Sequence, residues 1–207
     1  MKKHITLITI LLLVACKSET KKDTSQTVQD EQKEQVSNNA VTPENKPESN
    51  GTFLCKINGK DWAYTKASGI IDTYGKTKKH EAIMTFTKKL DKGSESVQLF
   101  YDADTNKLKK VSIQLKVPKT DGKTMTAMYI YHPDTNNVHP NAKLSGTIDL
   151  SNPTKASGNA EVSDLDVRYN KNDIAKADDK LITVEGLNFK NVGYSNLDKA
   201  FGNDSND

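Results

Sequence analysis

Apolar and polar residues alternate with a period of two along most of the chain after residue 51, and this pattern limits the possible folds more than any other feature. In its clearest stretch, residues 109–117, aliphatic side chains occupy every second position: Val111, Ile113, Leu115 and Val117. Successive side chains of a β-strand point to opposite faces of a sheet. The pattern therefore predicts strands that each bury one face, because helical apolar residues would recur every three or four positions.

Nine segments of this kind lie between turn signals such as Asn58-Gly59 and Asp121-Gly122. They are residues 52–57, 60–65, 81–88, 96–101, 109–117, 124–131, 143–150, 158–167 and 181–189. Helix signals are few: residues 172–180 favour one or two turns, and residues 195–201 favour a short helix with Ser195 as its N-cap. We therefore expect an all-β domain, a single antiparallel β-sandwich or barrel of about nine strands.

Residues 17–50 have a different composition. None of these 34 positions holds an aromatic residue, Leu, Ile or Met, and Ser, Thr, Gln, Asn, Glu and Lys dominate. Such a segment cannot bury enough apolar surface to offset the entropy of ordering it. We expect residues 16–50 to form a disordered tether with a reach of about 30 Å, and residues 51–207 to form the β-rich domain.

The first sixteen residues are typical of an export signal. Two lysines precede a run of ten mostly apolar residues that ends in Leu13-Val14-Ala15-Cys16. As a helix this run spans only about 15 Å, half of a bilayer core of roughly 30 Å. The Leu-Val-Ala-Cys ending resembles the lipobox of bacterial lipoproteins. This resemblance implies a signal peptide over residues 1–15, a lipidated Cys16 carrying acyl chains such as palmitate, and a location in the cell envelope.

The domain itself shows a second resemblance. It opens with Phe53, Ile57-Asn58-Gly59-Lys60-Asp61 and Trp62, and two later strands carry Ser-Gly pairs, Ser145-Gly146 and Ser157-Gly158. This pattern resembles a group of small β-rich lipoproteins of Bacteroidota whose function is uncharacterised. The resemblance implies a β-rich fold and an outer-membrane location, on its periplasmic or its surface face. It implies no activity and no site residues.

Charge restricts the class of partner. The whole chain has a formal net charge of +3, too small for a protein that reads nucleic acid, so we expect none. The charge is unevenly spread, because residues 76–123 hold twelve Lys against six acidic residues, whereas residues 124–207 hold eight basic against twelve acidic residues. Either these two parts of the fold attract each other, or the lysines form a face for anionic lipid headgroups or an acidic glycan.

Only one cysteine remains once Cys16 carries lipid. Cys55 alternates with Phe53 and Ile57, so it is expected to lie on a buried strand face as a small core residue rather than a reactive thiol. No disulfide can form within the domain, and we expect a monomer.

Three groups of residues suggest metal ligands. Asp102-x-Asp104-x-Asn106 begins like a calcium loop, but Lys107 stands where the loop needs Gly and Ile113 where it needs Glu, which favours a hairpin turn. The other two groups are five aspartates (Asp164, Asp166, Asp173, Asp178 and Asp179) and three histidines (His80, His132 and His139). Each group lacks the converging partners that a site requires, so we expect no metal and no cofactor.

Four aromatic residues, Trp62, Tyr64, Tyr129 and Tyr131, are candidates for a sugar platform or a protein contact, although Trp62 is interpreted first as a core residue. No phosphate loop or catalytic motif occurs, and we expect no catalytic residues. The sequence thus predicts a non-enzymatic, lipid-anchored protein that binds or scaffolds through an unknown protein or glycan ligand. The alternative is an inhibitor or immunity-type lipoprotein that blocks a cell-wall-degrading enzyme.

Overall fold

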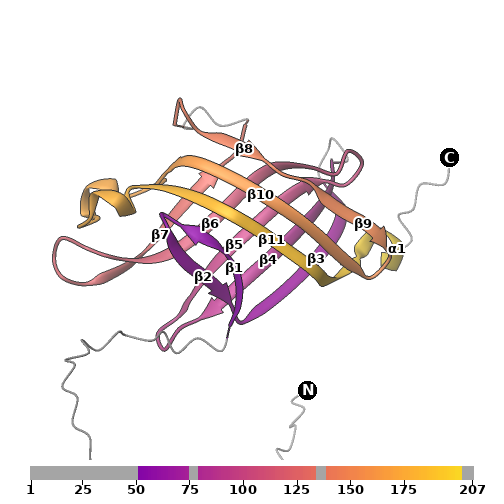
Figure 1. Cartoon of the computed structure of the whole chain (residues 1–207), viewed down its shortest axis with the longest axis horizontal. Helices are drawn as coiled ribbons and strands as arrows, with labels where there is room; N and C mark the ends of the chain where they lie inside the picture. The colour runs from indigo at the N-terminus through magenta and orange to yellow at the C-terminus, as the bar shows by residue number, and fades with distance from the viewer. Residues whose placement is uncertain (1–50, 75–78, 134–138, 202–207) are drawn as a thin grey trace, which may run out of the picture. The chain divides into compact units, whose positions relative to one another are not determined.

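The computed structural model describes residues 51–74, 79–133 and 139–201 (Figure 1). The expected signal peptide, the expected lipidation site Cys16 and the expected tether lie outside these residues. The described residues form strands β1 (Thr52–Ile57), β2 (Lys60–Tyr64), β3 (Lys66–Tyr74), β4 (Lys79–Lys89), β5 (Ser94–Asp102), β6 (Lys107–Pro118), β7 (Thr124–Tyr131), β8 (Lys143–Ser145), β9 (Ile148–Asn152), β10 (Lys155–Asp166) and β11 (Leu181–Asn196). Three short helical segments complete them: η1 (Lys171–Asp173), η2 (Ala177–Asp179) and α1 (Leu197–Phe201).

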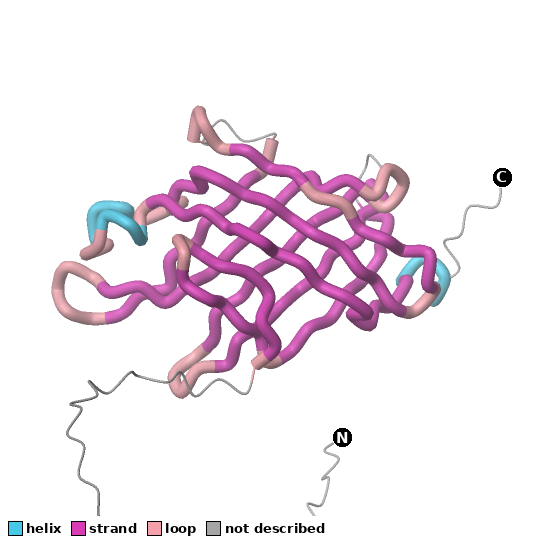
Figure 2. Tube along the Cα trace, in the orientation of Figure 1, coloured by secondary structure: helices cyan, strands magenta, loops and turns pink. Residues whose placement is uncertain are grey.

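The β-rich expectation is confirmed, since strands make up most of the described chain (Figure 2). Two strands were not foreseen. β3 carries Gly69 on its inner side, where an added Cβ would lie 2.7 Å from the sulfur of Met84, so the strand lacks the large alternating residues that mark the others. The segment 143–150 divides into β8 and β9 at Gly146, whose φ of +157° brings it against the backbone of Asn159.

All eleven strands belong to one sheet, in the order β2-β1-β11-β3-β4-β5-β6-β7, with β10 paired to β11, β8 and β9. The prediction of a purely antiparallel fold is wrong, because β11 pairs with β3 in parallel at Tyr194–Gly69 and Asn196–Ile71. β11 extends seven residues beyond the predicted end at 189, and this extension makes the parallel contact. The sheet is open along this order, with β2 and β7 at its ends, so the closed-barrel alternative is also wrong.

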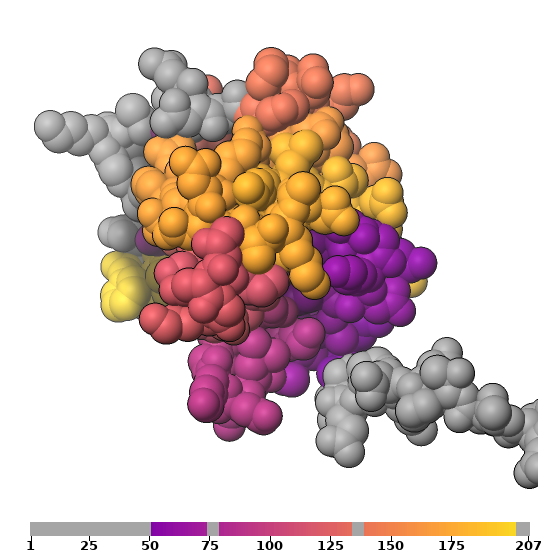
Figure 3. All heavy atoms as spheres, turned by 90° about the vertical axis from the view of Figure 1, so that its left-hand side faces the viewer, coloured from indigo at the N-terminus to yellow at the C-terminus, as the bar shows by residue number. Residues whose placement is uncertain are grey.

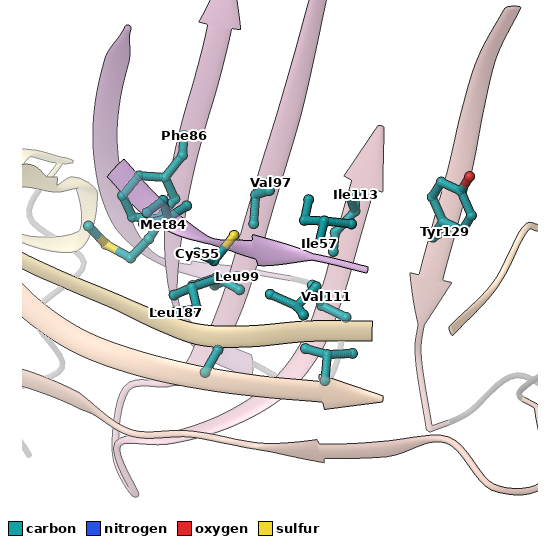
Figure 4. Packing of buried hydrophobic residues seen from close by; sticks show 14 of the residues in the cluster. Cys55, Ile57, Met84, Phe86, Val97, Leu99, Val111, Ile113, Tyr129 and Leu187 are labelled. Atoms are coloured by element: carbon teal, nitrogen blue, oxygen red, sulfur yellow. The ribbon is translucent and has the colours of Figure 1, made fainter. Parts of the chain in front are cut away.

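The sheet folds over so that β10 and β11 cross in front of β3 to β6 (Figure 1). The hydrophobic core lies between these two layers (Figure 4). Phe189 of β11 connects them, since its ring centroid lies 5.2 Å from that of Phe86 on β4 and 6.4 Å from that of Tyr101 on β5. Apolar burial of this kind is the main favourable term in folding.

The helical segments are short, as expected, but one cap differs from the prediction. Ser195 is still part of β11, opposite Ile70. Asn196 caps α1 instead, because its side-chain oxygen accepts a hydrogen bond from the backbone N–H of Lys199 at 3.1 Å. Within the described residues, no helix has the length and apolar character needed to cross a membrane.

Candidate functional site

Two polar surfaces of the domain bring together residues from distant strands. The first, the lysine groove, is a hollow of about 760 Å³. It is lined by Gly51, Ala63, Thr65, Lys88, Lys89, Leu90, Asp91, Lys92, Lys116 and Thr124. The end of the β4–β5 hairpin contributes five of these residues, while β2 and the β6–β7 hairpin contribute others. Figure 3 shows the end of the domain where the β4–β5 hairpin, in magenta, projects beside the β6–β7 hairpin, in coral.

The four lysines of the lysine groove differ in their partners. Lys88 lies 3.6 Å from the carboxylate of Glu95. The ammonium of Lys116 donates a hydrogen bond to the neutral hydroxyl of Thr126 at 2.8 Å and makes no ion pair with any described residue. In the described part of the chain, Lys89 and Lys92 make no ion pair, and both side chains are exposed. The groove is therefore cationic, with Asp91 as the acidic residue in its lining.

Glu95 lies beside the lysine groove and joins three strands. Its carboxylate accepts hydrogen bonds from the indole N–H of Trp62 at 3.0 Å and from the backbone N–H of Lys116 at 3.1 Å. Trp62 is buried, with 4% of its surface exposed, so its interpretation as a core residue is confirmed. Charge-assisted hydrogen bonds of this kind are among the stronger ones in proteins. They hold β2, β5 and β6 together next to the groove.

In the described part of segment 76–123, most lysines outside the groove are paired with nearby acids. Lys110 lies 2.7 Å from Glu81, Lys109 lies 3.9 Å from Asp102, and Lys119 lies 3.2 Å from Asp121. These pairs lie within the segment 76–123, not between it and the acidic segment 124–207. By contrast, three of the four groove lysines make no ion pair among the described residues.

The second surface, the His80 cluster, consists of His80, Asp104, Asp198 and Thr73. The Nδ1 atom of His80 lies 2.8 Å from Asp104, and its Nε2 atom lies 3.6 Å from Asp198. Asp198 is 5% exposed, and it accepts hydrogen bonds from the backbone N–H of Thr73 at 3.0 Å and from its hydroxyl at 2.8 Å. The cluster therefore joins α1 to β3 and β4.

The cluster borders a pocket of about 300 Å³ that has both basic and acidic walls. Its lining comprises Lys79, His80, Glu81, Asp102, Asp104, Lys109, Lys110, His132 and Pro133. The fold thus brings His80, His132 and the Asp102 loop to one pocket, which their separation in the sequence did not indicate. Asp198 and Thr73 were not foreseen, since neither lies in a motif and they meet only through the packing of α1 on β3.

The Asp102 loop is a turn, as predicted. The carboxylate of Asp102 accepts hydrogen bonds from the backbone N–H groups of Thr105 at 2.7 Å and Asp104 at 3.1 Å. These bonds, chiefly that from Thr105, lower the pKa of Asp102 below its ordinary value. Asn106 closes the turn with a φ of +58°.

The remaining candidate ligands lie apart or have other partners. Asp166 pairs with Lys171 at 2.6 Å, and the ring of His139 accepts a hydrogen bond from the backbone N–H of Asn141 at 3.3 Å. Among the described residues, no three His, Cys, Asp or Glu side chains gather as a metal site would require. Residues 134–138, between His132 and His139, lie outside the described part of the chain.

Cys55 is fully buried, so its predicted place in the core is confirmed, and burial raises the pKa of its thiol to about 12 (Figure 4). The other candidate aromatic residues also belong to the core or pack against it. Tyr129 is fully buried, with its hydroxyl donating to the backbone oxygen of Asp179, and Tyr64 and Tyr131 pack against the core. These rings stabilise the fold and do not form an exposed surface.

Comparisons of the chain with protein families, with curated proteins and with solved structures found no match.

Proposed function

We propose that this protein is a lipid-anchored protein of the bacterial cell envelope, held in the outer membrane through Cys16, and that its β-domain acts by binding an envelope component. The observation that carries this proposal is the lysine groove. It is a wide, cationic hollow between β2 and the β4–β5 and β6–β7 hairpins. Its residues Lys89 and Lys92 have no ion-pair partner among the described residues. A surface with uncompensated charge attracts a ligand of opposite charge.

The partners of His80 argue against its use as a general base. A histidine that acts as a general base needs one ring nitrogen directed at the group whose proton it removes. Both nitrogens of His80 face carboxylates, those of Asp104 and Asp198. This arrangement suits a structural link between α1 and the sheet.

The anchor is tested by replacing Cys16 with Ser in the full chain. We expect Cys16→Ser to move the protein from the detergent phase to the aqueous phase and to block removal of the signal, because the hydroxyl cannot carry the lipid that holds the chain in the membrane. Cys55→Ser is the matched control and should stay in the detergent phase. A Cys16→Ser protein that is still processed and still partitions into detergent would overturn the anchor.

Binding is tested by affinity capture. The chain from residue 17 to residue 207, immobilised by its C-terminus, is exposed to envelope extract in low and high salt. We expect salt-sensitive capture of an anionic envelope component. Capture of a cell-wall-degrading enzyme in both salts would instead support the inhibitor alternative.

A further inference from the structure

We propose that the lysine groove docks the domain onto anionic phospholipid headgroups of the membrane that holds the anchor. This inference rests on the proposed function, in which Cys16 carries the lipid, and it names the component that the domain binds. Three features of the groove lead to it: its place on the domain, its charge, and the apolar residue among its lysines.

The groove lies where the chain enters the domain. Gly51 is the first described residue and lines the groove. Only residues 17–50 separate it from Cys16. In the proposed function, the link from Cys16 therefore joins the domain beside the groove, which keeps the groove within reach of the membrane. A tether also raises the effective concentration of the second contact, to the millimolar range for a short flexible linker.

The charges of the groove suit phosphate. Lys89, Lys92 and Lys116 contribute three ammonium groups without a carboxylate partner within 4.0 Å among the described residues, whereas Lys88 is paired with Glu95. Lysine binds phosphate as a compact point charge and needs no fixed orientation, so it suits a mobile layer of headgroups. The single arginine, Arg168, lies elsewhere and stacks on Tyr169.

The tip of the β4–β5 hairpin also carries an apolar side chain. Leu90 is half-buried and stands between Lys89 and Asp91 in the groove lining. Helices that lie on membranes combine lysines with apolar side chains that enter the headgroup region, and Leu90 supplies one such side chain among the groove lysines. A soluble acidic glycan would use the same charges but has no need of Leu90.

The test uses the chain from residue 17 to residue 207, which lacks Cys16 and so cannot be held by lipid. Its co-sedimentation is measured with vesicles of phosphatidylcholine alone and with vesicles containing phosphatidylglycerol. Each lysine near an anionic surface strengthens binding about fivefold. We therefore expect Lys89→Glu combined with Lys92→Glu to weaken binding to phosphatidylglycerol vesicles by at least ~30-fold, and 0.5 M salt to weaken binding of the parent chain.

The matched control is Lys155→Glu combined with Lys190→Glu. Both lysines are exposed and lie on β10 and β11, outside the groove. These two substitutions change the net charge of the chain by the same amount as Lys89→Glu with Lys92→Glu. If the groove is the binding site, the control should bind nearly as well as the parent chain. Equal weakening of the two double variants would overturn the groove as the site, because it would show a response to net charge alone.

Two further outcomes would contradict the inference: equal binding to both kinds of vesicle, and displacement of the chain from phosphatidylglycerol vesicles by low concentrations of an acidic polysaccharide. Loss of this inference leaves the anchor intact, because the vesicle assay uses a chain without Cys16. Conversely, failure of the Cys16→Ser test would leave a positive vesicle result standing. The two proposals therefore fail separately.

Discussion

Replacing Phe189 with Ala should remove the ring that connects the two layers of the sheet. Phe189 is 3% exposed and contacts the rings of Phe86 and Tyr101, which lie on different strands of the opposite layer. Truncation of a buried Phe to Ala costs about 3–5 kcal/mol. Because two ring contacts are lost as well as buried area, we expect a loss of about 4 kcal/mol in the free energy of unfolding.

Urea denaturation, followed by circular dichroism on the chain from residue 17 to residue 207, measures this loss. With a slope of roughly 2 kcal/mol per molar urea, the midpoint should fall by about 2 M. Phe53→Ala is the matched control, because Phe53 is 51% exposed on β1, and its midpoint should change little. If Phe189→Ala does not fold, Phe189→Leu should still show a loss of about 1 kcal/mol.

The packing of the two layers would be refuted by a different pattern. Equal midpoint shifts for Phe189→Ala and Phe53→Ala would show that Phe189 contributes no more than a surface residue. The same conclusion would follow if Phe189→Leu left the midpoint unchanged. Either result would mean that Phe189 of β11 does not pack against β4 and β5.

Three other predictions concern single groups. Cys55 should not react with a thiol reagent at pH 8 until denaturant is added, because its thiol is buried with a pKa of about 12; rapid reaction of the native chain would contradict its place in the core. The melting temperature should be the same in calcium, zinc and chelator, because among the described residues no three His, Cys, Asp or Glu side chains gather as a metal site requires. An occupied site would add about 2.7 kcal/mol to the free energy of unfolding at a hundredfold excess of metal over Kd. Stability should decline as the pH falls below about 4, because backbone hydrogen bonds lower the pKa values of Asp102, Asp121 and Asp149 in the folded state. As the pH falls, these carboxylates are protonated in the unfolded chain before they are protonated in the folded chain, which favours unfolding. An unfolding midpoint that stays constant from pH 5 to pH 3 would contradict these hydrogen bonds.

Local signals were sufficient for much of the fold. The bounds predicted for the strands now called β1 and β7 agree with the structure, because clear turn signals flank both segments. The burial of Cys55 and Trp62 was also predicted correctly. Strand alternation was wrong for Phe53, because the register of β1 shifts between Phe53 and Cys55, which leaves Phe53 exposed and buries Leu54. β3 escaped prediction because two of its inner positions hold the small residues Ala67 and Gly69; Met84 and Tyr194 on neighbouring strands leave no room for a side chain at Gly69.

The candidate surfaces were harder to predict. The excess of lysine in residues 76–123 was visible, yet it did not separate Lys110, which pairs with Glu81, from Lys89 and Lys92, which have no ion-pair partner in the part of the chain that the structure describes. Such a distinction depends on which strands are neighbours and on how far each side chain reaches. A strand's period of two assigns a side chain to a face but does not name the residue opposite.

By itself, the sequence determined that residues after 51 form a strand-rich domain with Cys55 in its core and a turn at Asp102, because alternation and turn chemistry act over a few residues. Only the tertiary structure decided that β11 pairs in parallel with β3, that His80 meets Asp198, and that lysines of separate hairpins share one groove beside Gly51. These contacts join residues far apart in the chain. They form only when the two layers pack. A local sequence pattern therefore cannot identify which distant residues will be in contact.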